Sequence, residues 1–257
     1  MSELIESRLP CPSCPSSDAY HLYENGGYCF SCHYFKPAKN KVKVKLPTKS
    51  NPSELNLFFN ASTQLSDKAL AYLYDYQFTD ELIKTYDIRE DENFITWSSR
   101  TQKYFNSGHR LLLPYYENSI LQFYEAKRLD ITNPLKYVSS AKGFLFKTFT
   151  TEPSTLVVVE DILSAMRVGE TISTVALRGT AINSKILNQL LELDCNYIIW
   201  LDHDRAGYKA ALELGKKLLW NGTKVEYITT TQDPKWYTDL EIKGILKNER
   251  KCNPRIL

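Results

Sequence analysis

The chain has 257 residues, of which 43% are hydrophobic and 24% are charged, and its formal net charge is +2. This is the composition of a globular protein, and it excludes a chain that is disordered or coiled coil throughout. The length allows one large domain or two to three small ones. No stretch approaches the roughly 18 consecutive apolar residues that a membrane span needs, and the opening segment has no secretion signal. We therefore expect a cytoplasmic protein without a membrane partner. Because its net charge is close to zero, nucleic acid would have to be bound by local basic clusters.

Four of the six cysteines lie near the amino terminus, in two C-x2-C pairs separated by fourteen residues. They are Cys11, Cys14, Cys29 and Cys32. Each pair places two thiolates on one tight turn, and two pairs complete the tetrahedron that a structural zinc prefers. Two disulfides are the alternative, which the absence of a secretion signal disfavours. The spacing predicts one structural zinc ion, and so short a segment is expected to fold with its metal.

A small hairpin is predicted between the two cysteine pairs, with strands over 19–23 and 27–30 around a turn at 24–26. The segment 36–53 that follows has six lysines, three prolines and no acidic residue. Lysine repulsion and proline stiffness favour an extended linker. Its lysines either contact a phosphate backbone or are simply solvated.

Helix signals and then strand signals appear between 54 and 152. Ser66 and Thr79 each precede a segment with acidic residues in its first turn, so we expect capped helices over 67–74 and 80–86. The apolar pattern then changes to period two. The strands that it predicts cover 94–99, 111–117, 120–129 and 136–138, with a hairpin turn at 117–119. This part of the chain is expected to be a mixed α+β unit.

From residue 156 onward, apolar strands alternate with amphipathic helices. The strands are predicted over 156–160, 174–177, 197–202 and 224–229, and the helices over 162–168, 184–193 and 206–220. Such alternation implies an α/β fold with a mainly parallel sheet and helices on both faces. Ligands of these sheets bind at the carboxyl ends of the strands.

These patterns divide the chain into five predicted parts. They are a zinc-binding hairpin domain over 1–36, a basic flexible linker over 37–53, an α+β subdomain over 54–152, the parallel α/β subdomain over 153–240, and a carboxyl-terminal helix and tail over 241–257.

Acidic residues stand where the predicted strands end. Glu160 and Asp161 follow the first strand, Asp202 and Asp204 follow the third, and Asp233 follows the last. The carboxyl ends of parallel strands meet at one edge of a sheet, so these side chains should share a cavity. Their repulsion is relieved by a hard cation, which for oxygen ligands means Mg²⁺ or Mn²⁺. The alternative is that they cap the following helices, which applies most to Asp161 and in part to Asp204.

A family resemblance rests on these residues. Glu160 after a strand, the segment LDHD followed by Ala206 and Gly207, and the turn Asp233-Pro234 resemble the TOPRIM fold of bacterial-type primases, topoisomerases and some nucleases. The segment ALRGT at 176–180 also resembles the one that follows the second strand in primases. With a zinc hairpin at the amino end, the order is similar to the primase half of phage primase-helicases, over nearly the whole chain.

The resemblance implies roles for individual residues. Glu160 matches the invariant glutamate, which activates the attacking hydroxyl or organises metal, and Asp202, Asp204 and Asp233 match the metal-binding aspartates. One or two Mg²⁺ or Mn²⁺ ions are implied. The basic segment before the sheet has five basic residues against one acid between 127 and 147. Within it, the positions that match nucleotide- and template-contacting residues are Lys127, Arg128, Lys136 and Lys142, the first two with a catalytic role.

The implied activity is that of a DNA primase, which makes short RNA primers on single-stranded DNA from ribonucleoside triphosphates. No G-x-x-x-x-G-K-[ST] loop occurs in the sequence, so a helicase partner would be a separate protein, and a phage-encoded primase would act in the bacterial host cytoplasm. Gly26 stands where the best-known phage zinc hairpins have a template-reading histidine. Two alternatives are a metal-dependent TOPRIM nuclease and a non-catalytic recombination mediator with zinc and TOPRIM modules. A topoisomerase is disfavoured because no nucleophile stands out among 17 tyrosines.

Overall fold

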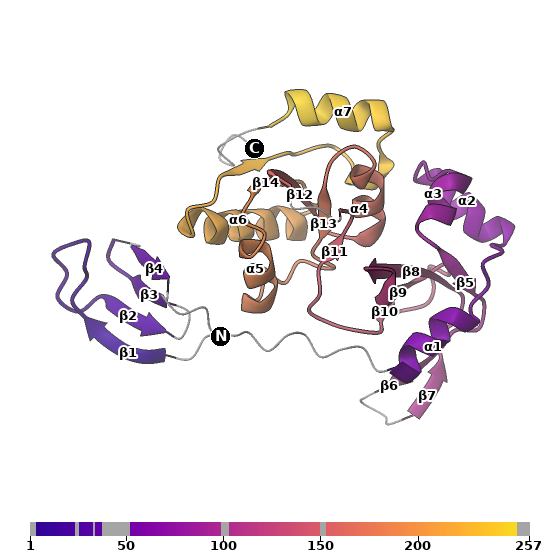
Figure 1. Ribbon diagram of the computed structural model, residues 1–257, viewed down its shortest axis with the longest axis horizontal. Helices are drawn as coiled ribbons and strands as arrows, with labels where there is room; N and C mark the ends of the chain where they lie inside the picture. The colour runs from indigo at the N-terminus through magenta and orange to yellow at the C-terminus, as the bar shows by residue number, and fades with distance from the viewer. Residues whose placement is uncertain are drawn as a thin grey trace.

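The computed structural model describes residues 4–23, 26–32, 34–37, 52–98, 103–149 and 153–250. Three parts follow one another along the long axis in Figure 1. A small all-β module lies at one end, a sheet with helices on both faces lies in the middle, and an α+β subdomain lies at the other end. No helix within the described ranges is long and apolar enough to cross a membrane.

The amino-terminal module is a four-stranded antiparallel sheet in the order β1-β2-β3-β4. Its strands are β1 (Leu4–Leu9), β2 (Tyr20–Tyr23), β3 (Gly26–Cys29) and β4 (Phe35–Pro37). The central pair is the predicted hairpin, in which Tyr20 pairs with Cys29, while turn residues 24 and 25 lie outside the described residues. The outer strands β1 and β4 were not predicted. The pairing of β1 is interrupted by register shifts and β4 has three residues, so neither strand has a clear pattern in the sequence.

The predicted linker lies largely outside the described residues, which resume at Pro52. Pro37 ends β4, and Pro52 begins α1 (Pro52–Asn60), where the fixed φ of proline suits the first helical position. Regular structure therefore extends into both ends of the predicted linker.

The α+β subdomain begins with the two helices that the capping signals predict, α2 (Asp67–Asp75) and α3 (Asp80–Thr85). The Ser66 and Thr79 side chains accept the backbone N–H groups of the third residue after each, as predicted. Its main sheet has the order β10-β9-β8-β5 and is antiparallel. These strands are β5 (Arg89–Asp91), β8 (Arg110–Glu117), β9 (Ile120–Arg128) and β10 (Tyr137–Ser139).

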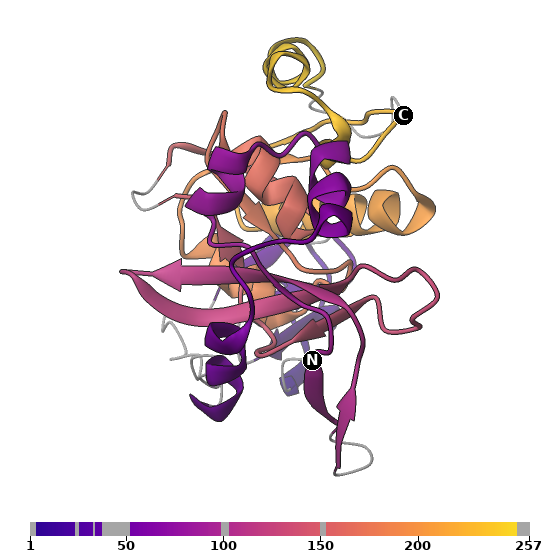
Figure 2. The same cartoon turned by 90° about the vertical axis from the view of Figure 1, so that its right-hand side faces the viewer.

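The predicted turn between β8 and β9 is confirmed. Asn118 and Ser119 both have positive φ, at 51° and 62°, which matches the right-handed twist of the two strands. Figure 2 shows this long hairpin crossing the front of the subdomain, with a second hairpin extending away from it. The second hairpin pairs β6 (Ile95–Ser98) with β7 (Lys103–Asn106).

The central sheet has five strands in the order β11-β13-β12-β14-β15. They are β11 (Phe146–Lys147), β12 (Thr155–Val159), β13 (Thr174–Ala176), β14 (Asn196–Ile199) and β15 (Val225–Tyr227). All pairings are parallel except that of β11 with β13, so the predicted mainly parallel sheet is confirmed. Its helices are α4 (Ile162–Gly169), α5 (Ser184–Leu191), α6 (Arg205–Trp220) and α7 (Asp239–Asn248), with a 3-10 turn η1 (Pro234–Trp236).

The two faces of the sheet pack into separate cores because neighbouring residues of β12 point in opposite directions. Val157 and Val159 join the core that includes residues of α4, α7 and the α+β subdomain, whereas Leu156 and Val158 join the core with residues of α5 and α6. Helices therefore cover both faces, as predicted. Helix α7 begins before the predicted boundary at 241, because Thr238 forms a capping box with Glu241.

Candidate functional site

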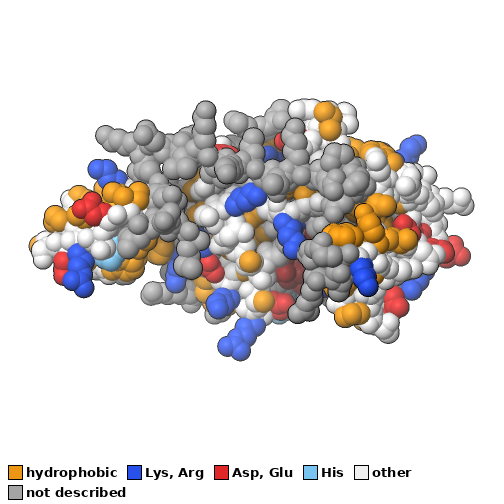
Figure 3. Space-filling view, turned by 90° about the horizontal axis from the view of Figure 1, so that it is seen from below, with side chains coloured by type: hydrophobic (Ala, Val, Ile, Leu, Met, Phe, Trp, Pro, Cys, Tyr) orange, Lys and Arg blue, Asp and Glu red, His pale blue; other side chains and the backbone are white. Residues whose placement is uncertain are grey.

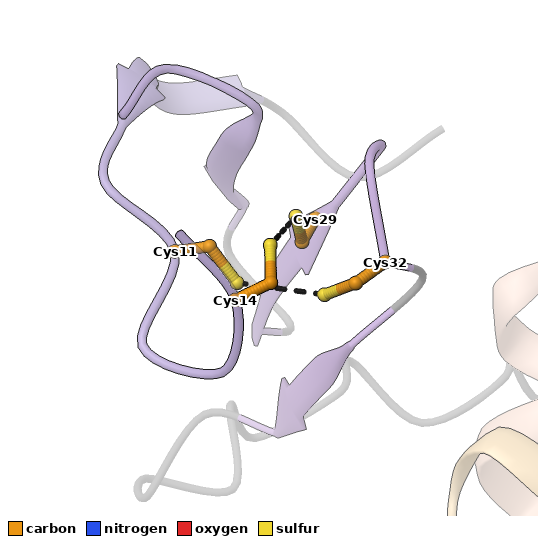
Figure 4. A group of neighbouring side chains, drawn as sticks. All are labelled: Cys11, Cys14, Cys29 and Cys32. Carbon is orange, nitrogen blue, oxygen red and sulfur yellow. Dashed lines mark hydrogen bonds between the residues drawn. The ribbon is translucent and has the colours of Figure 1, made fainter. Parts of the chain in front are cut away.

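The four predicted zinc ligands meet in the amino-terminal module, as Figure 4 shows. The Sγ atoms of Cys11 and Cys32 are 3.6 Å apart, those of Cys14 and Cys29 are 3.8 Å apart, and all four lie within 4.8 Å of one another. A tetrahedron with Zn–S bonds of about 2.3 Å has sulfur–sulfur distances of about 3.8 Å. The cysteines are unbonded thiols, so the disulfide alternative is not adopted.

Burial raises the pKa of Cys29, but backbone N–H groups of Cys32 and Ser31 more than offset this, and the pKa falls to about 7. Such a thiol readily supplies the thiolate that a zinc ion requires. The module therefore has both the spacing and the donor chemistry of a structural zinc site.

The predicted acidic residues follow the ends of three adjacent parallel strands. Glu160 follows β12, Asp202 and Asp204 follow β14, and Asp233 lies in the segment after β15. The Asp233 Oδ1 atom accepts the backbone N–H of His203 at 3.1 Å, which joins the last two segments. The sheet thus brings to one edge the residues that sequence analysis placed there.

Two of these carboxylates also cap helices, as the alternative interpretation predicted. The Asp161 Oδ1 atom accepts the Ser164 N–H at 2.8 Å, and the Asp204 Oδ1 atom accepts the Gly207 N–H at 2.7 Å. Gly207 is required for close approach, because a Cβ atom there would overlap the backbone carbonyl oxygen of Asp202. The first turn of α6 is therefore packed directly against the segment that carries the acidic pair.

A lysine that sequence analysis missed lies among the carboxylates. The Lys235 Nζ atom is 2.9 Å from Asp161 Oδ2, 2.8 Å from Asp233 Oδ2 and 3.8 Å from Asp202 Oδ2, and 6% of its side chain is exposed. Burial lowers the pKa of Lys235, but the carboxylates of Asp161 and Asp202 outweigh this, so the pKa lies above its ordinary value. The only sequence signal was its position two residues after a predicted ligand.

Two buried carboxylate oxygens in the cluster have no hydrogen-bond partner, Glu160 Oε2 and Asp202 Oδ1. Burial and the neighbouring acids Asp204 and Asp161 raise the pKa of Glu160. Burial and the same Asp161 raise the pKa of Asp202 to about 7. Unpartnered, mutually repelling oxygens are the donor set that a hard divalent cation satisfies. Across the described ranges, however, the four cysteines are the one group of three or more such side chains placed so that they could hold a metal ion as they stand.

The predicted basic residues are not equivalent. Lys127 is buried, donates to the Tyr137 hydroxyl at 2.7 Å and lies 5.8 Å from the Tyr72 ring centre, and burial lowers its pKa to about 8. Arg128 donates to the Asn133 carbonyl oxygen. The hydrogen bonds of these two side chains therefore stabilise the basic segment before the central sheet.

Lys136 and Lys142 are exposed, as a contact with nucleic acid requires. The charge of Lys136 lowers the pKa of Glu160 against the larger effect of burial, which places Lys136 near the acidic centre. On the face seen in Figure 3, Lys and Arg side chains are spread over the length of the molecule, including its middle.

The ALRGT segment ties the sheet to the α+β subdomain. The backbone N–H groups of Arg178 and Gly179 donate to the Glu160 carbonyl oxygen. The Arg178 side chain is buried and pairs with Glu125 of β9 at 3.2 Å, and it also donates to the Ser139 hydroxyl of β10. These contacts fix the strand end that carries Glu160 against the basic segment.

A cleft of about 610 Å³ opens beside the acidic pair, between the start of α6 and the end of β15. Its lining includes Asp202, His203, Arg205, Tyr208, Leu212 and Thr230. Apolar and polar side chains both line it next to the carboxylates, as in pockets that bind small molecules.

Comparison with known proteins agrees with this arrangement. Residues 158–239 match a protein family described as Toprim-like. The matched segment contains the acidic cluster and Lys235. No curated protein is a significant match.

The fold is similar to that of solved DNA primase structures. A DNA primase domain from Pseudomonas aeruginosa has a TM-score of 0.62 at 18% identity and covers 78% of each chain. The zinc-binding and RNA polymerase domains of the Aquifex aeolicus primase have a TM-score of 0.60 at 16% identity, over 97% of this chain and 81% of that chain. The primase fragment of the bacteriophage T7 primase-helicase has a TM-score of 0.51 at 16% identity, over 95% of this chain and 97% of that chain.

Proposed function

We propose that the protein is a DNA primase that joins ribonucleoside triphosphates on a single-stranded DNA template. The observation that carries the proposal is the pair of buried, unpartnered oxygens of Glu160 and Asp202 at a Toprim strand edge. The edge lies beside the basic segment of a primase-type fold. One solved structure of this fold is described as a primase catalytic domain bound to single-stranded DNA.

The residues of the site would have different roles in this reaction. A divalent ion, Mg²⁺ or Mn²⁺, held by Glu160, Asp202 and Asp204 would favour deprotonation of the primer 3′-hydroxyl and neutralise charge on the α-phosphate. Lys136 and Lys142 would attract the triphosphate and the template backbone by charge. Lys127 and Arg128 act as positioning residues, because each side chain donates a hydrogen bond within the protein, Lys127 to the Tyr137 hydroxyl and Arg128 to the Asn133 carbonyl oxygen.

The zinc module is proposed to hold the template. Its Phe30 ring is 54% exposed and contacts the rings of His21 and Tyr28, with centroids 4.8 Å and 4.9 Å away, so it is available to stack on an unpaired base. Tyr20 is buried and supplies the small core. The predicted division at 36, 53, 152 and 240 is part of the same proposal, with the boundaries at 53 and 240 moved to the starts of α1 and α7. A separate replicative helicase as partner and the host cytoplasm as location also belong to it.

The test is template-directed synthesis on circular single-stranded DNA with labelled triphosphates and Mg²⁺ or Mn²⁺. Asp204→Asn removes a ligand charge, while asparagine caps a helix as well as aspartate does, so α6 is preserved. We expect short RNA from the wild type and at least about 100-fold less from the variant. Glu213→Gln, an exposed acid on the same helix that pairs with Lys217, is the matched control and should synthesise normally.

The alternatives give other outcomes in the same assay. Metal-dependent loss of the circular DNA without RNA products would indicate a nuclease. DNA binding without either product would indicate a recombination mediator. Equal synthesis by the wild type and Asp204→Asn would refute the assignment of the carboxylate cluster.

A further inference from the structure

Lys235 is built into the acidic cluster rather than lying over it. It belongs to η1, whose preceding residue Asp233 is joined to the segment after β14 through the His203 N–H. Its ammonium group lies within 4.0 Å of three carboxylates and 5.8 Å from the Tyr76 ring centre. A buried ammonium with three carboxylate neighbours is a fixed positive charge at the centre of this part of the site.

The contacts divide the cluster into two halves. In the half around Lys235, Asp161 uses one oxygen for the Ser164 N–H and the other for Lys235. Asp233 uses one oxygen for the His203 N–H and the other for Lys235. Each oxygen of these two carboxylates therefore already accepts a hydrogen bond from the protein, so a metal ion would have to share these oxygens with the Lys235 ammonium or a backbone N–H.

The other half is open. Glu160 Oε2 and Asp202 Oδ1 are buried without a partner, and Asp204 engages one oxygen in its cap. Asp202 stands between the halves, because its other oxygen faces Lys235 at 3.8 Å. The oxygens without a hydrogen-bond partner thus belong to Glu160 and Asp202, neither of which hydrogen-bonds to Lys235.

Five carboxylates at one edge carry enough charge for two divalent ions, which in two-metal phosphoryl-transfer sites lie about 3.5–4 Å apart. We propose that Lys235 takes the place of one of these ions, so that the site binds a single divalent cation on Glu160, Asp202 and Asp204. The choice of a divalent cation rests on the proposed function. The inference adds that the Lys235 ammonium neutralises carboxylate charge that a second ion would otherwise neutralise. Asp233, predicted as a metal ligand, then serves to position Lys235.

The test counts Mn²⁺ ions bound to the zinc-loaded full chain, by the electron paramagnetic resonance signal of free Mn²⁺. The wild type should bind one ion, and Asp204→Asn should bind none. Lys235→Gln, which removes the ammonium, should bind two ions. The double variant Lys235→Gln/Asp204→Asn should bind one. A wild type that binds two ions, or a folded Lys235→Gln that still binds one, would overturn the proposal.

A conservative variant protects the test against a folding failure. Lys235→Arg keeps the charge and should bind one ion like the wild type, and the wild-type count is decisive even if Lys235→Gln does not fold. The counts are independent of synthesis. If the ion counts are as expected and no RNA is made, the primase proposal fails and the proposal for Lys235 stands. If the wild type makes RNA and binds two ions, only the proposal for Lys235 is refuted.

Discussion

The two candidate metal centres of this protein are built on opposite principles. The thiol cluster comes from two short turns 14 residues apart in sequence, and its sulfur atoms already have tetrahedral spacing. The carboxylate cluster is assembled from the ends of three strands spread between residues 160 and 233, and among the described residues it is not placed to hold a metal ion as it stands. Neutral thiols can approach without an ion, whereas carboxylates repel, so the second centre contains a cation of its own in Lys235. The comparison teaches that the first centre is organised by local chain geometry and the second by electrostatics.

The largest expected effect is on the zinc binding and folding of the thiol cluster, the centre formed by two short turns. Cys29→Ser removes the buried ligand, and because zinc binding to small zinc modules contributes about 10–16 kcal/mol to their folding, the module should lose its ion and unfold. Zinc content and thermal melting should show loss of the ion with an unchanged main transition. Ser31→Ala in the same turn is the control. Earlier melting of the whole chain would show that the two regions do not fold independently.

Removing the internal cation should be the next largest change. Lys235→Gln leaves Asp161 buried without its ion-pair partner, and breaking a buried pair typically costs about 3–5 kcal/mol. Urea unfolding of the zinc-loaded protein without Mg²⁺ or Mn²⁺ should show this loss, and added Mn²⁺ should restore part of it. Lys243→Gln, an exposed site on α7, should change stability by less than about 0.5 kcal/mol. A similarly small change for Lys235→Gln would contradict the electrostatic account.

The pH dependence of stability sharpens the comparison further. Asp202 has a folded-state pKa of about 7, above the ordinary value of 3.8, so the folded protein holds a proton that the unfolded chain releases between these values. Stability without divalent ions must therefore fall as the pH rises through this window, and the full penalty is present above pH 7. Asp202→Asn cannot ionise and should be more stable than the wild type at about pH 8, by about 2–4 kcal/mol.

The measurement is urea unfolding of both proteins at about pH 5 and about pH 8, with zinc bound and no other divalent ion. The advantage of the variant should shrink at the lower pH, where the wild-type side chain is already protonated in the folded state. An advantage of equal size at both pH values would show that Asp202 is not the titrating group.

The smallest effect concerns the contact between the two regions. The Tyr28 ring of the zinc module lies 5.6 Å from the Trp220 ring at the end of α6. A double-mutant cycle of Tyr28→Ala and Trp220→Ala should give a coupling energy of about 0.5–1.5 kcal/mol. The unfolding free energies of the four proteins give this coupling energy. A value of zero would mean that the contact between the two rings does not stabilise the protein.

The sequence predicted those features that depend on the spacing of nearby residues or on the period of the apolar pattern. The cysteine spacing, the caps at Ser66 and Thr79, and the alternation of apolar strands with helices predicted the zinc ligands, two helices and the parallel sheet. The carboxylates were predicted because strand ends of a parallel sheet share an edge. Strands β1, β4, β5, β7 and β11 were missed. Four of them have two to four residues, too few to show a period-two pattern, and the pairing of β1 is interrupted by register shifts.

The direction of individual side chains was beyond sequence reasoning. Lys127 and Lys136 lie in the same basic segment, yet one is buried against tyrosine rings and the other is exposed. Lys235 looks like a surface residue in the sequence, and its place among three carboxylates follows from the turn of η1. Such placements depend on contacts between segments that are far apart along the chain.

Gly207 has a consequence for which substitutions this turn can accept. A side chain at this position would collide with the backbone of Asp202 whether or not a metal is bound. The glycine is therefore a requirement of the fold, whereas the acidic side chains beside it are a requirement of the proposed chemistry. A variant that lacks these acids can keep this turn, but a variant that lacks the glycine has to move it.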